Sequence, residues 1–190
     1  SLDLFWPELI ITVVILTALI VDLCIEKSKS DVVGWVLVIG LLITAIAIWN
    51  QDKTTTTLFT DMIVLDPFAT FFKLLIILST LLVAVVSWQN NELDEYRKGE
   101  YFTLLGILVL GLFLMASSID LIMVYISIEV VSIMSFILAG YLKLDTRSNE
   151  AGLKYVVYGA FSSGIMLFGL SILFGLTGST NYFIIQKSLA

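Results

Sequence analysis

The sequence predicts an all-α protein that crosses a membrane six times, and two properties of the chain support this prediction. First, 59% of its 190 residues are hydrophobic and 14% are charged, with a mean hydropathy of +1.03, whereas about a quarter of the residues in soluble domains are charged. Second, the apolar residues form six runs, each close to the roughly 20 residues that a helix needs to cross a bilayer. The chain therefore belongs in a membrane.

The six predicted helices follow one another with polar loops between them. They cover about residues 7–25, 32–49, 67–88, 101–116, 120–142 and 151–176. The longest polar linker, residues 50–62, predicts an irregular or hairpin-like connection. The last residues, 177–190, predict a turn followed by a tail without assigned structure.

Several polar residues stand where helices are predicted to begin. Pro7 suits the first helical turn, and Glu8 beside it is favourably placed at the positive end of the helix dipole. Asp66 precedes Pro67 at the start of the third helix, and Asp120 stands at the start of the fifth. Carboxylates in such places usually cap the helix or contact water.

Lys and Arg residues in the short loops predict the orientation of the chain. The loops that follow odd-numbered helices hold Lys27, Lys29, Arg97, Lys98, Lys143 and Arg147, whereas the other side holds Lys53 and Lys187. This imbalance predicts an amino terminus outside, with the basic loops in the cytoplasm or its equivalent. The four tryptophans fall near predicted helix ends, where aromatic belts form at the membrane interface.

Composition excludes several classes of function. One cysteine, Cys24, and no histidine exclude Cys/His zinc sites, histidine-ligated haem and iron–sulfur clusters held within this chain. We therefore expect no cofactor and no metal site in this chain, and redox chemistry on other polypeptides. The net charge of -6 and the absence of basic clusters argue against nucleic acid as a partner.

Glu129 is the main candidate functional residue because it lies near the middle of an apolar run. About ten residues into its helix, it is roughly 15 Å along a span of about 30 Å. A charge at that depth costs several kcal/mol unless it is paired or hydrated, so such residues mark ion pathways. Tyr125 at i−4 and Ser132 at i+3 share its face and can donate hydrogen bonds to the carboxylate or hold water. The alternative is a protonated glutamate that only fixes helix packing.

Lys154 is the candidate partner of Glu129. It lies about one turn inside the sixth helix, with Tyr158 at i+4 on the same face. Because helices five and six form an antiparallel hairpin, Lys154 can point between them, with Glu129 up to about 13 Å deeper by helical rise. We expect one or two waters, rather than a direct bond, to link the two side chains. The alternative is that Lys154 extends to the membrane interface, as lysines near helix ends often do.

Lys73 is a further intramembrane charge, less than two turns into the third helix. It follows Asp66 by seven residues, so both lie on one helical face. Extension of the lysine to the interface is the favoured interpretation. A place at the outer end of a proton path is the alternative.

Four stretches together resemble one protein family. EVVSIMSFILAGYLK from Glu129 and EAGLKYVVYGAFSSGIMLFGLSILFGLTGS from Glu150 resemble the antiporter-like N subunit of respiratory complex I, the proton-pumping NADH:quinone oxidoreductase. DPFATFFKLL around Lys73 and WPELI around Glu8 are similar to its early helices. The resemblance covers most of the chain and is most specific in the last third. Gly152 departs from it, because alanine is usual at that position.

The resemblance implies a membrane-arm subunit that translocates protons through a buried pair formed by Glu129 and Lys154, within a larger antiporter-like helix bundle. Residues 1–100 would be an amino-terminal three-helix segment and residues 101–190 the start of the proton-translocating unit. Supporting roles are expected for Lys73, Tyr125, Ser132 and Tyr158. The implied partners are other membrane-arm subunits, peripheral iron–sulfur and flavin subunits, and the lipid bilayer.

Two other functions stay open at the level of the sequence. A subunit of a multisubunit Na⁺/H⁺ antiporter would use the same glutamate and lysine chemistry. A purely structural membrane subunit would need neither charge. We expect a bacterial inner (cytoplasmic) membrane as the location, with an organellar energy-transducing membrane as the alternative.

Overall fold

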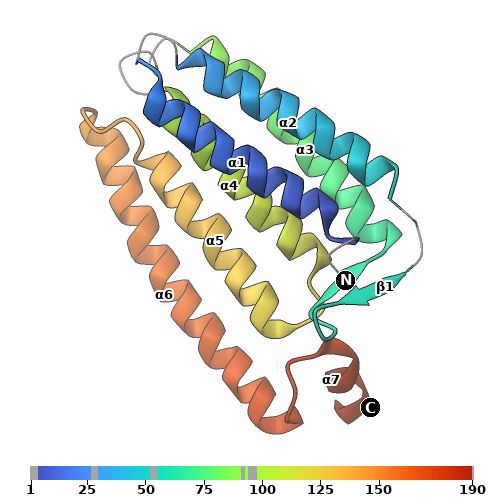
Figure 1. Ribbon diagram of the computed structural model, residues 1–190. Helices are drawn as coiled ribbons and strands as arrows, with labels where there is room; N and C mark the ends of the chain where they lie inside the picture. The colour runs from blue at the N-terminus through green and yellow to red at the C-terminus, as the bar shows by residue number, and fades with distance from the viewer. Residues whose placement is uncertain (1–3, 27–29, 52–54, 91–92, 94–97, 190) are drawn as a thin grey trace.

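The computed structural model describes residues 4–26, 30–51, 55–90, 93 and 98–189. Within these ranges the chain forms long helices and one short hairpin (Figure 1). The elements are α1 Trp6–Cys24, α2 Asp31–Trp49, β1 Thr56–Leu58, β2 Ile63–Leu65, α3 Pro67–Trp88, α4 Lys98–Ser117, α5 Leu121–Ala139, α6 Thr146–Thr177 and α7 Tyr182–Leu189. Helices α1 to α6 are each long and apolar enough to span a membrane. The predicted all-α membrane fold with six spanning helices is confirmed.

The largest difference from the predicted boundaries is at the start of α6. This helix begins at Thr146 instead of near residue 151, because Asp145 caps its amino terminus by accepting a hydrogen bond from the Arg147 N–H at 2.9 Å. The linker after α2 contains β1, which pairs antiparallel with β2, in agreement with the hairpin-like connection. The tail without assigned structure forms α7.

Helices α1 to α4 make a four-helix bundle, and α5 and α6 form an antiparallel hairpin along its side (Figure 1). The bundle core contains Ile11, Leu37, Ile77, Phe102 and Phe113, all fully or almost fully buried. Helix α4 packs against α1, α2, α3 and α5, so it contacts both of the segments predicted to meet at residue 100. That division, like the predicted orientation, stays a prediction.

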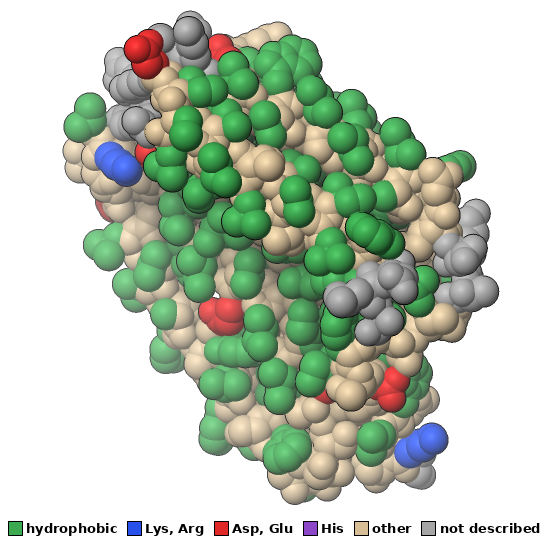
Figure 2. Space-filling model, viewed as in Figure 1, with side chains coloured by type: hydrophobic (Ala, Val, Ile, Leu, Met, Phe, Trp, Pro, Cys, Tyr) green, Lys and Arg blue, Asp and Glu red, His purple; other side chains and the backbone are tan. Residues whose placement is uncertain are grey.

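The outer surface suits a hydrocarbon environment. Figure 2 shows hydrophobic side chains over most of one face, with the basic side chains near the two ends. Large apolar side chains are exposed on every spanning helix; examples are Leu23, Ile46, Val86, Ile122 and Phe161. Exposure of this surface to water would be unfavourable, whereas in a bilayer the same side chains contact lipid chains that are equally apolar.

Asp120 and Asn181 together link three segments at the end of the bundle that holds the β-hairpin. Its carboxylate accepts hydrogen bonds from the Ile122 and Met123 N–H groups at 2.9 and 3.3 Å, and thus caps α5. It also accepts a hydrogen bond from Thr180 Oγ1 at 2.5 Å. The Asn181 side chain donates to the Asp61 carbonyl in the hairpin turn at 3.0 Å. The segment after α6 is therefore tied to both α5 and the hairpin.

The α5–α6 hairpin is closest where two glycines meet. A Cβ added to Gly152 would lie 2.9 Å from Gly140 Cα, and a backbone atom cannot move aside without a shift of the helix. We expect Gly152→Ala to lower the free energy of unfolding by about 1–3 kcal/mol, measured by SDS titration of the chain in mixed micelles. Gly164→Ala is the matched control, because nothing lies within 4 Å of its added Cβ and alanine favours helix. Equal destabilisation by both substitutions would contradict this contact.

Candidate functional site

Glu129 occupies the middle of α5. It is the ninth of the 19 residues of the helix, about 12 Å from Leu121 by helical rise. Its Oε1 is buried and has no hydrogen-bond partner among the residues that the structure describes. Tyr125 and Ser132 lie on α5 within about one turn of it, yet neither donates to this oxygen. The carboxylate therefore keeps capacity to bind a proton, a water or a cation.

A pocket of about 580 Å³ lies between α5 and α6 and includes Glu129. Its lining consists of Glu129, Ile133, Phe136, Ile137 and Gly140 from α5, with Asn149, Gly152, Leu153, Val156 and Ala160 from α6. Glu129 and Asn149 are the polar side chains of this lining, and the others are apolar or glycine. Because the lining follows α5 from Glu129 to Gly140, the pocket extends from mid-span toward the α5–α6 turn.

Lys154 does not enter this pocket. Its Nζ lies 2.5 Å from Glu150 Oε1 on the same helix, and the two side chains are 65% and 60% exposed. The expectation that Lys154 points between the helices toward Glu129 is wrong for this arrangement. Gly152 faces α5, and two further residues turn the helix by about 200°, which directs Lys154 away from α5. The early start of α6 also places Glu150 inside the helix, at the i−4 position where it can pair with Lys154.

The depth of the two charges agrees with the predicted spacing. Gly140 and Gly152 lie at one level, with Glu129 eleven residues below that level on α5 and Lys154 two residues below it on α6. Helical rise then places Glu129 about 13 Å deeper than Lys154. Glu129 and Lys154 therefore lie at different depths. In addition, Lys154 is on the face of α6 that points away from α5.

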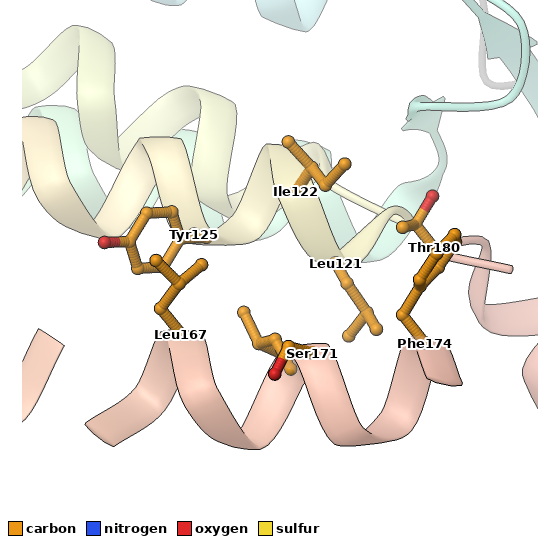
Figure 3. Close-up of a pocket in the computed structure, with 8 residues that line it drawn as sticks. Leu121, Ile122, Tyr125, Leu167, Ser171, Phe174 and Thr180 are labelled. Carbon is orange, nitrogen blue, oxygen red and sulfur yellow. The ribbon is translucent and has the colours of Figure 1, made fainter. Parts of the chain in front are cut away.

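The tyrosines of the predicted site occupy different surfaces. Tyr125 lines a second pocket between α5 and α6, of about 230 Å³, together with Leu121, Ile122, Leu167, Leu170, Ser171, Phe174 and Thr180 (Figure 3). Its hydroxyl points away from Phe174 and Thr180, in the direction in which α5 continues to Glu129 (Figure 3). Tyr158 is exposed on α6 one turn after Lys154. Tyr125 and Ser132 therefore lie about one turn from Glu129 along α5 but do not line its pocket. Tyr158 lies one turn from Lys154 on the exposed face of α6.

Lys73 has a partner that the sequence did not reveal. Its Nζ lies 2.5 Å from Glu8 Oε1, with Lys73 1% and Glu8 0% exposed. Extension of Lys73 to the interface, the favoured interpretation, is therefore wrong. Asp66 instead caps α3 by accepting a hydrogen bond from the Ala69 N–H at 2.7 Å. The available signal was that Glu8 and Lys73 both lie within two turns of helix starts predicted on the same side of the membrane.

Tyr141 lies just beyond α5, at the end of the bundle with the α5–α6 turn. Burial, followed by the nearby carboxylate of Glu100 and then that of Asp22, raises the pKa of its hydroxyl far above the usual value of 10. Its ring packs edge-on against Tyr101. Tyr141 therefore stays neutral at physiological pH, and its hydroxyl can take part in hydrogen bonds without carrying charge.

Comparisons with known proteins support a single class. Residues 118–189 match the family described as NADH:quinone oxidoreductase/Mrp antiporter, transmembrane. The chain is 46% identical over 189 residues to NADH-quinone oxidoreductase subunit N 2 of Chloroherpeton thalassium, a match that covers 97% of the chain and 37% of the relative. It is 38% identical over 193 residues to NADH-quinone oxidoreductase subunit N of Chlorobium chlorochromatii, covering 100% of the chain and 38% of the relative.

Two solved structures share the fold. Respiratory complex I from Thermus thermophilus with bound aureothin contains a chain with a TM-score of 0.77 and 19% identity, covering 96% of this chain and 42% of that chain. The membrane-bound sulfane sulfur reductase, an archaeal respiratory membrane complex, contains a chain that matches with a TM-score of 0.74 and 17% identity. The match covers 95% of this chain and 39% of that chain. The chain spans less than half the length of these relatives.

The six-helix fold, together with the family match over residues 118–189, is that of membrane proteins of the NADH:quinone oxidoreductase and Mrp antiporter class. Within the class, it is similar over nearly its whole length to subunit N of NADH-quinone oxidoreductase. A match to less than half of each relative is consistent with an amino-terminal portion. The resemblance found in the sequence is confirmed.

Proposed function

We propose that this chain is the amino-terminal part of a membrane-arm subunit of NADH:quinone oxidoreductase, in which Glu129 takes part in proton translocation. The observation that carries this proposal is the buried Oε1 of Glu129 at mid-span, which has no hydrogen-bond partner among the described residues and lies beside a pocket that extends toward one end of the bundle. The relatives named as subunit N support the assignment to the oxidoreductase. Redox chemistry takes place on other subunits.

The chemistry follows from the cost of a charge in the bilayer. An ionised Glu129 is unfavourable by several kcal/mol unless water or a cation reaches it. Water in the 580 Å³ pocket can both hydrate the carboxylate and deliver a proton to it. Asn149, the other polar side chain of the pocket lining, can hold such water.

Lys154 enters the proposal through Glu150. The two charges compensate each other on the outward face of α6, with Tyr158 one turn further on. Separation of Lys154 from Glu150 would remove this compensation and leave each charge without its partner. A change at the outward face of α6 is therefore the proposed trigger. Lys73 has a different partner and is treated separately below.

The family match also includes Mrp antiporters, so a subunit of a multisubunit Na⁺/H⁺ antiporter is the second candidate. A free carboxylate oxygen can bind Na⁺ as well as a proton. The oxidoreductase requires further partners: other membrane-arm subunits, peripheral iron–sulfur and flavin subunits, and the bilayer of a bacterial inner membrane.

Purification through an affinity tag on this subunit tests the assignment. We expect iron–sulfur and flavin subunits to co-purify, and the complex in liposomes to move protons when NADH reduces quinone in Na⁺-free buffer. Isolation without those subunits, together with Na⁺-dependent proton exchange that does not need NADH, would instead establish the antiporter.

A further inference from the structure

Glu8 and Lys73 form a buried ion pair that the proposed proton transfer does not use. The pair links α1 to α3 across 65 residues of sequence, at 2.5 Å between Glu8 Oε1 and Lys73 Nζ. We propose that it is a static assembly pair, which selects the packed arrangement of α1 opposite α3 in the membrane and takes no part in proton transfer. The assembly role rests on the geometry of the pair alone, whereas its separation from proton transfer rests on the proposed function.

The position of the pair explains why a specific link is needed there. Helices α1 and α3 each pack against both α2 and α4, and the Glu8–Lys73 contact reaches directly between them. In a bilayer, apolar side chains gain little by choosing one helix neighbour over another, because lipid is equally apolar. A charge that finds its partner in only one arrangement of α1 and α3 does provide such a choice.

The energetics indicate that the ion pair selects one arrangement of α1 and α3 and adds little to the stability of the protein. Glu8 Oε2 is buried and lacks a hydrogen-bond partner within the described ranges. A buried ion pair offsets its desolvation only when its remaining polar atoms are also satisfied, so this pair is a weak net stabiliser. Either charge without the other is far less favourable, because it stays unpaired in hydrocarbon. Packing of α1 opposite α3 is the arrangement that avoids this penalty.

The surroundings of the pair separate it from Glu129. Both sites lie roughly 10 Å from the helix starts near the β-hairpin, by the rise of α3 and α5. Helix α4 packs against α1, α3 and α5, and its residues 104–116 are all apolar or glycine. At this depth α4 presents Val109 and Phe113, both fully buried. No side chain of this stretch can pass a proton from Lys73 to Glu129.

Removal of one charge or of both distinguishes assembly from proton transfer. Glu8→Leu and Lys73→Met are each expected to lower the amount of assembled complex in the membrane at least tenfold. The double variant Glu8→Leu/Lys73→Met is expected to recover assembly to within about threefold of wild type, because no buried charge is left unpaired. The recovered complex should move as many protons per NADH as wild type. Lys187→Met, which changes an exposed lysine on α7, is the control and should assemble normally.

The charge-swapped variant Glu8→Lys/Lys73→Glu is a second test, in case Glu8→Leu/Lys73→Met fails to assemble because its apolar side chains pack poorly. Recovery of assembly in the charge-swapped variant alone would also support the pair. Failure of both double variants to recover assembly would overturn the proposal, since no coupling between the residues would remain. Normal assembly of the single variants would overturn it as well. A recovered double variant with fewer protons per NADH would show that the pair carries protons and would refute the static role.

Discussion

Replacement of Glu129 by glutamine is expected to lower proton translocation per electron at least tenfold while the complex stays assembled. Glutamine has nearly the same size as glutamate but cannot take up and release a proton at physiological pH. Because Oε1 has no hydrogen-bond partner among the described residues, the substitution removes no contact there that holds the fold. The function should therefore be lost without loss of the structure.

The measurement is proton uptake per NADH oxidised in liposomes that contain the purified complex. Ser127→Ala is the matched control, since Ser127 is buried two residues earlier on α5 and its hydroxyl donates to the Met123 carbonyl within the helix, at 2.7 Å. Ser127→Ala should pump normally. Normal pumping by an assembled Glu129→Gln complex would remove Glu129 from the proton path and leave the family assignment unaffected.

The six spanning helices were predictable because their length and hydropathy follow from the thickness of the bilayer. The same criterion missed the first turn of α6, since Thr146 to Glu150 is polar and extends the helix beyond the apolar run. The cap at Asp145 was the available signal, because a capping residue does not depend on hydropathy. Helix α7 was missed for a similar reason: it has eight residues, too few for the criterion that found the spans.

The depth of Glu129 was also predictable from sequence, but the partner of each charge was not. Depth depends on position along one helix, whereas pairing depends on which faces of two helices meet. A spanning helix is apolar all round, so hydrophobic periodicity does not identify its packed face. The contact between Gly140 and Gly152 turns Lys154 outward, and the bundle of α1 to α4 brings Lys73 to Glu8. Both outcomes required the tertiary arrangement.

Asp120→Ala is expected to lower the free energy of unfolding by about 2.5–4 kcal/mol. Loss of the cap on α5 accounts for about 1 kcal/mol, and loss of the charge-assisted hydrogen bond from Thr180 accounts for about 1.5–3 kcal/mol. Asp120 is 4% exposed, so water cannot fully replace these bonds. SDS titration of the chain in mixed micelles measures the change.

Asp120→Asn and Thr180→Ala separate the two contributions. Asparagine is as good a helix cap as aspartate, so Asp120→Asn should lose only the charge assistance and cost about half as much as alanine. Thr180→Ala should keep the cap and lose only the bond across the two segments. Equal stability of Asp120→Ala and Asp120→Asn would show that the carboxylate contributes no cap. Because Thr180 also lines the pocket that contains Tyr125 (Figure 3), loosening this contact should free the far end of α6 from α5. The Asp120 contacts thus hold α5 and the end of α6 together, and Glu129 lies in the middle of α5.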